Sequence, residues 1–322
     1  MDPSIIVGVL IAALAIISVA LRFWSRRYTK TGLSWDDGLI LLALLATLLT
    51  DALIIWATSS APGADDTQDD PAADENYTPS DVLYNKAIYA ATVLYFTITS
   101  STKLSIVLMY HRLFSVDPSF RSQIIAAGVL VSVYWLGLTL AAILQCVPVE
   151  YNWIPYWHPE YCFNFNVFWF VTGILEAAID IYIIAMPIRM VLRLQLSTSR
   201  KIATTAVFLL GVFVIASGLV KAIVGYSPGS HAVAFDKAEI WTEVHCCTGI
   251  VCACLPVCWQ LFIRLKHITP SWASIPSIWS QLTSVHKSGS SRVTHSSSER
   301  QLARVSDEDV LPMYNITATK PA

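Results

Sequence analysis

The sequence predicts an all-α polytopic membrane protein: a bundle of seven transmembrane helices with its N-terminus outside and its C-terminus in the cytosol. Composition is the first reason, because hydrophobic residues make up 55% of the 322 residues and charged residues only 14%. Such a chain is too apolar for a surface in water. The second reason is that apolar residues form seven long runs, and the third is that Lys and Arg gather in alternate connections between the runs.

The seven apolar runs are each close to the length of about 20 residues that a helix needs to cross a bilayer. They cover residues 5–23, 38–57, 87–110, 124–146, 167–188, 202–226 and 240–263. Strands of a membrane barrel would alternate in polarity, whereas residues 128–144 are apolar on nearly every face. The first run follows an acidic residue, Asp2, and precedes basic ones, which is the reverse of a cleavable signal peptide. We therefore expect the first run to remain as a helix.

The distribution of Lys and Arg near the ends of the runs predicts the orientation. The connections after the first, third, fifth and seventh runs hold twelve of these residues: Arg22, Arg26, Arg27, Lys30, Arg112, Arg121, Arg189, Arg193, Arg200, Lys201, Arg264 and Lys266. The opposite connections hold only Lys86 and Lys237. Basic loops stay on the cytosolic side of a membrane. The N-terminus is therefore expected outside.

The predicted transmembrane domain covers residues 1–265, and residues 266–322 are expected to form a cytosolic tail. A short amphipathic segment near Trp279 would lie on the inner leaflet, followed by a disordered Ser-rich region. On the other side, the connection 58–86 carries seven acidic residues and is expected to be solvated, or to attract a cation or ligand. It also contains Asn76, which is followed by the residues of an N-glycosylation site.

Ionisable residues inside the predicted helices are the candidates for function, because burying a charge in a bilayer is costly. At a rise of about 1.5 Å per residue, Lys103 and Asp180 lie at matching depth in the inner half. Glu176 is one turn from Asp180 on the same helix face. We expect these three residues to form an inner polar site. It either pins two helices together through an ion pair, or binds a ligand or relays protons.

A second set of polar residues is expected in the outer half of the bundle, around an extracellular cavity. It consists of Asp51, Lys221, Glu243 and His245, with Glu239 nearby. Two alternatives stay open, because Glu239 suits the start of a solvent-exposed helix and His245 can be a hydrogen-bonded residue of the core.

The seven cysteines fall into two groups that predict different chemistry. Cys146 and Cys162 border a connection on the oxidising outer side, and we expect a disulfide between them. The other five lie between Cys246 and Cys258 in the last run, and their spacing does not form a tetrahedral metal site. We interpret them as small packing residues. No metal or other cofactor is indicated, and the motifs of common hydrolases and nucleotide enzymes do not occur.

Several short motifs resemble those of the fungal rhodopsin domain family of seven-helix membrane proteins. They begin with the basic cluster after the first run, Gly32-Leu33-Ser34 and Asp36-Asp37, and continue with Lys103-Leu104-Ser105, Tyr110-His111-Arg112-Leu113-Phe114, Cys146-Val147-Pro148 with Trp153, Asp180 with Pro187, Lys201 with Gly211, Trp241, Glu243 and Leu255-Pro256. The resemblance covers roughly residues 5–264. After Pro256 the chain departs from the family pattern, since Val257-Cys258-Trp259-Gln260 replaces a more basic continuation.

The resemblance implies a receptor-like membrane protein, because the family includes receptor candidates linked to pathogenicity and membrane proteins encoded in mycotoxin and other secondary-metabolite clusters. A retinal pigment is not expected, since residues 240–263 contain no Lys for a Schiff base. The expected partners are the bilayer, a small-molecule ligand and a cytosolic signalling protein, with no nucleic acid. The alternative is an intramembrane enzyme with Glu176 or Asp180 as general acid. A transporter is less favoured because no internal repeat is visible, and the membrane is either the plasma membrane or an endomembrane.

Overall fold

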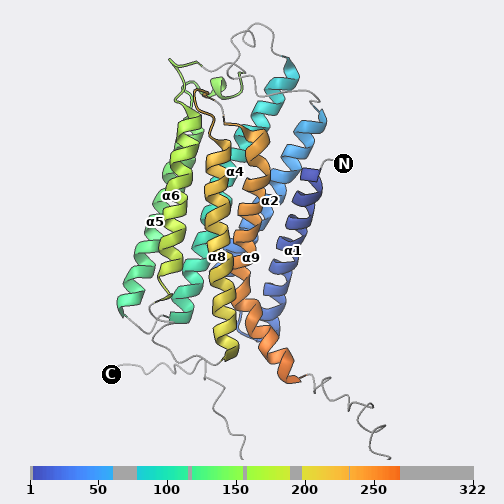
Figure 1. The fold of residues 1–322 in the computed structure, drawn as a ribbon, viewed down its shortest axis with the longest axis vertical. Coiled ribbons are helices and arrows are strands. Elements are labelled where there is room, and N and C mark those ends of the chain that lie inside the picture. Colours follow the sequence, from blue (N-terminus) through green and yellow to red (C-terminus); the bar gives the residue numbers. More distant parts are fainter. Residues whose placement is uncertain are drawn as a thin grey trace, which may run out of the picture. The chain divides into compact units, whose positions relative to one another are not determined.

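The computed structural model describes residues 3–60, 78–114, 118–154, 158–188, 198–231 and 233–268. Within these ranges there are seven helices long and apolar enough to cross a membrane (Figure 1). The described residues include no strand, apart from an isolated bridge between Cys146 and Cys162. The predicted all-α, seven-helix fold is thus confirmed, whereas the side of the membrane on which each end lies stays a prediction.

The helices begin and end close to the predicted runs, but most of them are longer. They are α1 (Pro3–Tyr28), α2 (Trp35–Ser60), α4 (Pro79–Phe114), α5 (Pro118–Ile143), α6 (Phe165–Ala185), α8 (Thr198–Gly225) and α9 (Phe235–Ile268). The largest extension is at the start of α4, where Thr78 and Asp81 cap the helix. Thr78 donates its backbone N–H and its hydroxyl to the Asp81 carboxylate, at 2.8 and 2.7 Å. Polar flanking residues therefore continue helices that apolar runs alone would end.

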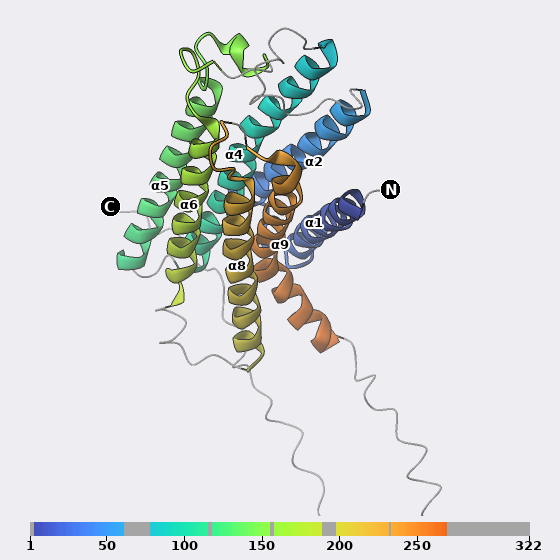
Figure 2. The same ribbon diagram turned by 45° about the horizontal axis from the view of Figure 1, so that its top comes forward.

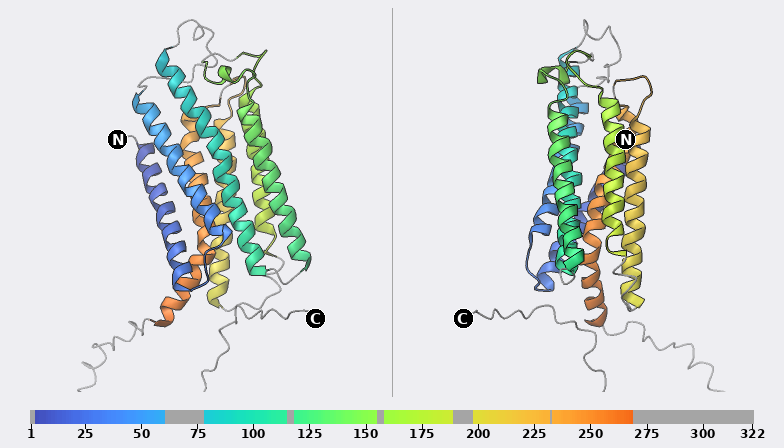
Figure 3. Two further views of the ribbon diagram at one scale, coloured as in Figure 1. Left: turned by 180° about the vertical axis from the view of Figure 1, so that it is seen from behind. Right: turned by 90° about the vertical axis from the view of Figure 1, so that its left-hand side faces the viewer.

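α4 is the central helix of the bundle. Its most apolar stretch is 67% buried, compared with 17% for those of α1 and α5. α4 packs against α2 and α5, while α9 packs against α1 and α8, and α8 packs against α6. Figure 2 shows α1 at one edge of the bundle and α5 near the other. From behind, α1, α2, α4 and α5 follow one another across the molecule (Figure 3).

The outward faces of the helices carry large apolar side chains. Leu10 on α1, Val133 on α5 and Leu209 on α8 are 64%, 63% and 68% exposed. Such side chains would be unfavourable in water in these numbers but match the hydrocarbon of a bilayer. The polar residues described below lie inside the bundle instead.

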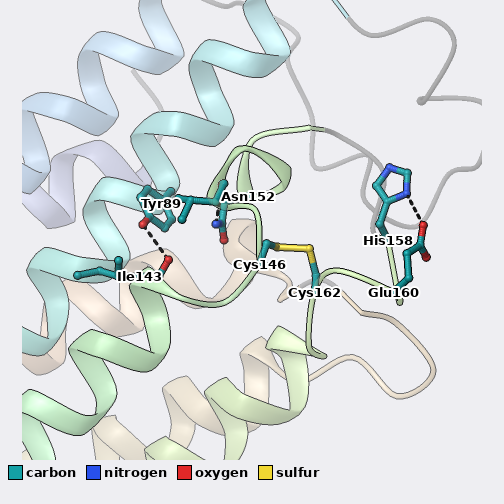
Figure 4. Close-up of a disulfide and its surroundings, with 8 residues drawn as sticks. Tyr89, Ile143, Cys146, Asn152, His158, Glu160 and Cys162 are labelled. Carbon is teal, nitrogen blue, oxygen red and sulfur yellow. Dashed lines mark hydrogen bonds and ion pairs between the residues drawn. A yellow bond between two sulfur atoms is a disulfide. The ribbon is translucent and has the colours of Figure 1, made fainter.

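The expected disulfide between Cys146 and Cys162 is present in the connection between α5 and α6 (Figure 4), with an S–S distance of 2.04 Å. α5 ends at Ile143 rather than at the predicted Cys146. The chain there turns to pair with the strand-like segment before α6, and Val147 donates its N–H to the carbonyl of Tyr161 at 2.9 Å. The connection includes the short 3-10 helix η1 (Val149–Asn152).

Side chains of α4 anchor this disulfide-bonded connection. The Tyr89 hydroxyl donates to the Ile143 carbonyl at 3.2 Å (Figure 4), and the Tyr89 ring meets the Trp153 ring edge-on at 6.2 Å between centroids. The Lys86 ammonium lies 5.2 Å from the centre of the Trp153 ring. Asn76 and the predicted amphipathic and Ser-rich segments of the tail lie outside the described residues, so these predictions stay as they were.

Candidate functional site

Glu176 on α6 is the centre of a charged cluster inside the bundle. Its side chain is 2% exposed, and it contacts side chains from three other helices. Lys103 of α4 lies 3.1 Å from Oε1, and Lys221 of α8 lies 3.0 Å from Oε2. The Nε2 atom of His245 on α9 is 3.4 Å from Oε1, and the Tyr95 hydroxyl of α4 donates to Oε2.

Asp180 extends this cluster by one helical turn along α6. The Lys103 ammonium lies 3.1 Å from Asp180 Oδ1, so one lysine bridges both carboxylates of α6. The predicted Lys103–Asp180 interaction is thus confirmed, and the three residues expected at the inner polar site lie together. The second oxygen of Asp180, Oδ2, is buried without a hydrogen-bond partner among the described residues. Whether this group binds a ligand stays a prediction.

Lys221 and His245 do not belong to the outer set in which the sequence analysis expected them. Both contact Glu176. We give the name central cluster to the six residues Tyr95, Lys103, Glu176, Asp180, Lys221 and His245. The assignment of these two residues to the outer set was wrong because the depth of each residue in the bilayer was counted from Cα positions along its helix. A long lysine side chain carries its ammonium group well away from its own Cα, and the helices are tilted relative to one another (Figure 1).

Tyr95 is the member of the central cluster that the sequence analysis missed. It donates a hydrogen bond to Glu176 and accepts one from Lys221. The Lys221 ammonium also lies 4.2 Å from the centre of the Tyr95 ring and 4.9 Å from that of Trp169, at distances where an aromatic face attracts a cation. Its spacing from Lys103 could have identified it, because the two residues are eight positions apart and share one face of α4.

The remaining residues expected in the outer set form a separate acidic group of Asp51, Glu239 and Glu243. The Asp51 carboxyl group lies near that of Glu243, with Glu239 as a further neighbour. Glu243 also accepts a hydrogen bond from the Cys247 thiol at 2.9 Å. The structure therefore brings Asp51 and Glu243 together. Among the described residues, no group of His, Cys, Asp and Glu has an arrangement that could hold a metal ion.

A second buried charged network joins the last part of α1 to the start of α2. Arg22 is fully buried, and its guanidinium pairs with Asp36 and donates to Asp37 at 2.8 Å. Arg26 contacts the same two carboxylates at 2.6 and 3.2 Å. We call these four residues the α1–α2 network. The sequence analysis had used both arginines only as signs of orientation and of the family resemblance, although Asp36 and Asp37 follow in the same connection.

The α1–α2 network is tied to α4 and α9 by hydrogen bonds. Arg22 donates to the carbonyl of Ala253 at 2.7 Å, and the Ser25 hydroxyl donates to that of Val257 at 3.0 Å. Ser105 of α4 donates to the carbonyl of Asp36 at 2.7 Å. These contacts lie on the same two helices that carry Lys103 and His245, so α4 and α9 connect the network to the central cluster.

Comparison with known proteins identifies the family. The fungal rhodopsin domain matches residues 21–264 of the chain. The chain belongs to the fungal rhodopsin domain family. The resemblance predicted from the motifs is confirmed, and the matched part of the fungal rhodopsin domain contains all of the central cluster and the α1–α2 network.

Curated relatives of this fungal rhodopsin domain include proteins named for biosynthesis clusters. The chain is 27% identical to "Wortmanamides biosynthesis cluster protein C" of Talaromyces wortmannii, over 81% of this chain and 72% of the relative. It is 27% identical to "Satratoxin biosynthesis SC1 cluster protein 4" of Stachybotrys chartarum, over 53% and 63%. It is 30% identical to a "SAT4 family membrane protein" of Emericella nidulans, over 58% and 48%. The chain therefore spans less than two thirds of the second and third relatives. No solved structure matches it.

The chemistry open to the central cluster follows from its charges. Two lysines face two carboxylates, the phenol of Tyr95 donates a hydrogen bond to Glu176, and the imidazole of His245 lies 3.4 Å from the same carboxylate. With His245 neutral, the charges of the cluster balance. Each member is buried, so removal of one leaves another unpaired in a medium where isolated charges are very unfavourable. The cluster can hold four helices together, and it can exchange protons among its members.

Proposed function

We propose that this chain is a receptor-like membrane component of a fungal secondary-metabolite pathway, in which the central cluster sets the relative positions of α4, α6, α8 and α9. The observation that carries the proposal is that one carboxylate, Glu176, serves as partner to side chains from three other helices. Interactions of this kind change in a few discrete steps rather than continuously, because each ion pair is either made or broken. A ligand that shifts one of the four helices would therefore rearrange the whole cluster.

The path from the central cluster to the predicted cytosolic side is short. On α4, Lys103 of the cluster is two residues from Ser105, which bonds to the α1–α2 network. On α9, His245 is eight residues from Ala253, whose carbonyl accepts from Arg22. Packed helices transmit displacements as rigid units. A rearrangement around Glu176 would thus reach the basic loops, where a cytosolic partner would bind.

The names of the relatives support a role in secondary metabolism that is not tied to one product. Three of them are named for clusters that make wortmanamides, satratoxin and polyenoic acids. The relatives are similar to one chain, yet the clusters for which they are named make different products. This fits a sensing or accessory role better than one reaction carried out by all of them. The small-molecule ligand, and the choice between plasma membrane and endomembrane, belong to the same proposal.

Replacement of the central carboxylate tests the proposal. In a strain that lacks the gene, we would reintroduce the wild type, Glu176→Gln, or the control Gly137→Ala, whose added methyl group meets nothing within 4 Å. Membrane levels of each protein would be checked by immunoblot. A receptor role predicts that the deletion and Glu176→Gln lower the transcripts of the pathway genes. Unchanged transcripts and metabolites in the deletion strain would refute it.

The predicted orientation belongs to this proposal and has its own test. A tag placed after Ala322 should be removed by protease only when the cytosolic face of sealed vesicles is accessible. Protection from that face would place the basic loops outside and move the partner-binding side to the other end of the bundle.

The second candidate is an intramembrane enzyme that acts on an apolar metabolite. It is favoured by the buried Asp180 oxygen that has no hydrogen-bond partner among the described residues, beside a carboxylate, Glu176, that could act as acid with it. Here the deletion strain would accumulate a precursor while transcripts stay unchanged. Purified wild-type protein would convert that precursor, and Asp180→Asn would not.

A further inference from the structure

The last turns of α1 have one buried face and one exposed face. Arg22 and Arg26 point into the bundle, where they belong to the α1–α2 network. Trp24, Arg27 and Tyr28 are exposed, and their spacing of three and four residues places them on one side of the helix. Because α1 lies at one edge of the bundle (Figure 2), no described part of the chain covers this side.

An apolar stripe leads along α1 to these residues. Leu10, Leu14, Ile17 and Trp24 are at least half exposed and follow the helical repeat, so they lie on one face together with Tyr28. In a membrane this stripe is covered by acyl chains. It runs from apolar side chains to aromatic rings and a basic residue, in the same order as the chains, glycerol region and phosphate of a phospholipid.

Three more side chains are exposed between the end of α1 and the start of α2. They are Lys30, Leu33 and Trp35, and the Trp35 side chain is 85% exposed. Tryptophan and tyrosine favour the headgroup layer of a bilayer, where an apolar ring and a polar N–H or O–H both find suitable surroundings. We give the name connection patch to the six exposed residues Trp24, Arg27, Tyr28, Lys30, Leu33 and Trp35.

The charge that the connection patch exposes is only positive. Arg27 and Lys30 carry it, and neither makes an ion pair with any described residue. Asp36 and Asp37 follow directly in the sequence, but both are buried and paired with the arginines of the α1–α2 network. The network therefore keeps its acidic groups away from the surface, and the patch is left with two cations that an anion can approach.

Lys30 occupies a position that does not require a lysine. Its φ angle is +54°, in the left-handed region where glycine and asparagine are common. Its N–H donates to the Arg27 carbonyl at 3.2 Å, where α1 ends. The turn thus depends on the φ angle and not on the ammonium group, so Lys30→Asn removes the charge and keeps the turn.

We propose that the connection patch is a binding site for an anionic phospholipid of the leaflet on this side of the membrane. The headgroup phosphate lies against Arg27 and Lys30, and the acyl chains follow the apolar stripe of α1. A soluble protein with an acidic segment would match the cations but not the stripe. Anionic lipids are concentrated in the cytosolic leaflet, so the inference rests on the orientation in the proposed function but not on the receptor role.

A lipid at the connection patch would also stabilise the contacts of this segment with α4. The Arg112 guanidinium of α4 donates to the Thr31 carbonyl at 2.7 Å, and the Ser105 hydroxyl donates to the Asp36 carbonyl at 2.7 Å. Both carbonyls lie within or directly beside the segment that carries the patch. A ligand that binds only the folded protein stabilises it by mass action, so bound lipid should favour these contacts.

The first experiment measures lipid selectivity. Full-length protein in detergent is titrated with phosphatidylserine or phosphatidylcholine of the same acyl chains, and bound lipids are counted by native mass spectrometry. We expect the wild type to bind phosphatidylserine more tightly. Each basic residue near an anionic surface contributes about 1 kcal/mol, or about five-fold in affinity, so Arg27→Ala with Lys30→Asn should weaken this binding about 25-fold. Equal binding of both lipids by the wild type would overturn the proposal and favour an acidic protein segment as the occupant.

Arg121→Ala is the matched control for Arg27→Ala. Arg121 is also exposed and lies on the predicted cytosolic side, but it belongs to α5. We expect Arg27→Ala alone to weaken the binding of phosphatidylserine about five-fold, and Arg121→Ala to leave it unchanged. Equal losses in the two variants would show a general effect of net charge and would contradict a site in the connection patch.

Competition and Trp35→Ser test whether the whole lipid is bound or only its headgroup. Glycerophosphoserine, which has the headgroup without acyl chains, should not displace phosphatidylserine at equal concentration. Displacement would assign the site to a soluble anion and refute the proposal. Trp35→Ser should weaken the binding of both lipids by the same factor, because the indole ring adds apolar contact without charge. Unchanged binding of both lipids in this variant would contradict the proposed site.

Thermal unfolding with added lipid tests the link between the patch and the stability of the fold. Phosphatidylserine should raise the wild-type midpoint more than phosphatidylcholine does, and this difference should vanish in the variant with Arg27→Ala and Lys30→Asn. Without added lipid this variant should unfold at the wild-type temperature, since asparagine suits the turn and Arg27 is exposed. Equal shifts of the wild type by the two lipids would contradict the proposal. These readouts use neither pathway genes nor membrane orientation, so this proposal and the receptor proposal fail independently.

Discussion

The central cluster and the α1–α2 network both bury opposite charges inside the bundle, but they are built differently. In the α1–α2 network two arginines each contact both aspartates, and the partners are 10 to 15 residues apart in the sequence. In the central cluster a single carboxylate is shared by lysines that lie 73 and 45 residues away, and by a histidine. The first joins two successive helices, and the second joins the four helices α4, α6, α8 and α9.

The choice of cations explains what each arrangement can do. A guanidinium is planar, always charged and matches carboxylates through several donors in a fixed fork, whereas an ammonium is a compact charge on a flexible stem. The α1–α2 network is therefore a rigid clamp with balanced charge. The central cluster combines flexible cations, the imidazole of His245 and a buried Asp180 oxygen that has no hydrogen-bond partner among the described residues. The comparison teaches that buried charge can serve either to fix a structure or to keep it switchable.

Arg22→Ala should have the largest effect, because it leaves Asp36 and Asp37 with one cation between them and removes the bond to Ala253. Removing one partner of a buried ion pair costs about 3 to 5 kcal/mol, so folded protein should be nearly lost in size-exclusion chromatography after detergent extraction. Arg27→Ala is the control on the same helix, where the side chain is exposed. Equal yields for the two variants would show that the clamp is not essential for folding.

Lys103→Met should come next, again about 3 to 5 kcal/mol, because it leaves Glu176 with fewer cations and removes the ammonium group that contacts Asp180. Asp180→Asn should cost less, since Lys103 keeps Glu176 as a partner. In the double variant part of the combined loss should be recovered, because Asp180 no longer carries a stranded charge. Thermal stability of the purified proteins measures this coupling, and strictly additive losses would show that the two side chains do not interact in the membrane.

Removal of the disulfide by joint Cys146→Ser and Cys162→Ser should cost about 3 kcal/mol, as expected for a closed loop of this length with a sequence separation of 16. The bridge lies in the connection between α5 and α6, whereas both charged clusters lie inside the bundle, so the coupling between Lys103 and Asp180 should stay unchanged. Mass spectrometry of non-reduced wild-type peptides should find the two cysteines linked. Free thiols at both positions in fresh membranes would exclude the bridge.

Arg22→Lys should have the smallest effect and tests the contrast between the two cations. The lysine keeps the charge but loses the fork that contacts both aspartates and Ala253. We expect a loss of about 1.5 to 3 kcal/mol, the range for hydrogen bonds to charged groups. The reciprocal exchange, Lys221→Arg, would introduce a larger planar group between Tyr95 and Trp169 and should also destabilise the protein. Full stability of Arg22→Lys would remove the distinction between a rigid clamp and a flexible cluster.

The candidate site could be predicted in part, and the residues themselves show why. Lys103, Glu176 and Asp180 were found together because a buried charge needs an opposite charge at the same depth, and depth along a helix can be counted. Lys221 and His245 were assigned to the wrong group because their contacts depend on side-chain reach and helix tilt. Arg22 was missed as a structural residue because an arginine at a helix end looks the same in sequence whether it faces water or two aspartates.

The sequence by itself determined the number of helices, the family and the disulfide. Each of these can be recognised from short stretches of the chain: apolar runs long enough to cross the bilayer, short motifs that resemble those of the family, and two cysteines at the ends of one connection. The tertiary structure alone decided that Glu176 is shared by α4, α8 and α9, and that Tyr95 joins it. These contacts join residues up to 81 positions apart. Their geometry depends on how helices tilt and pack, and no periodicity within a single helix records that.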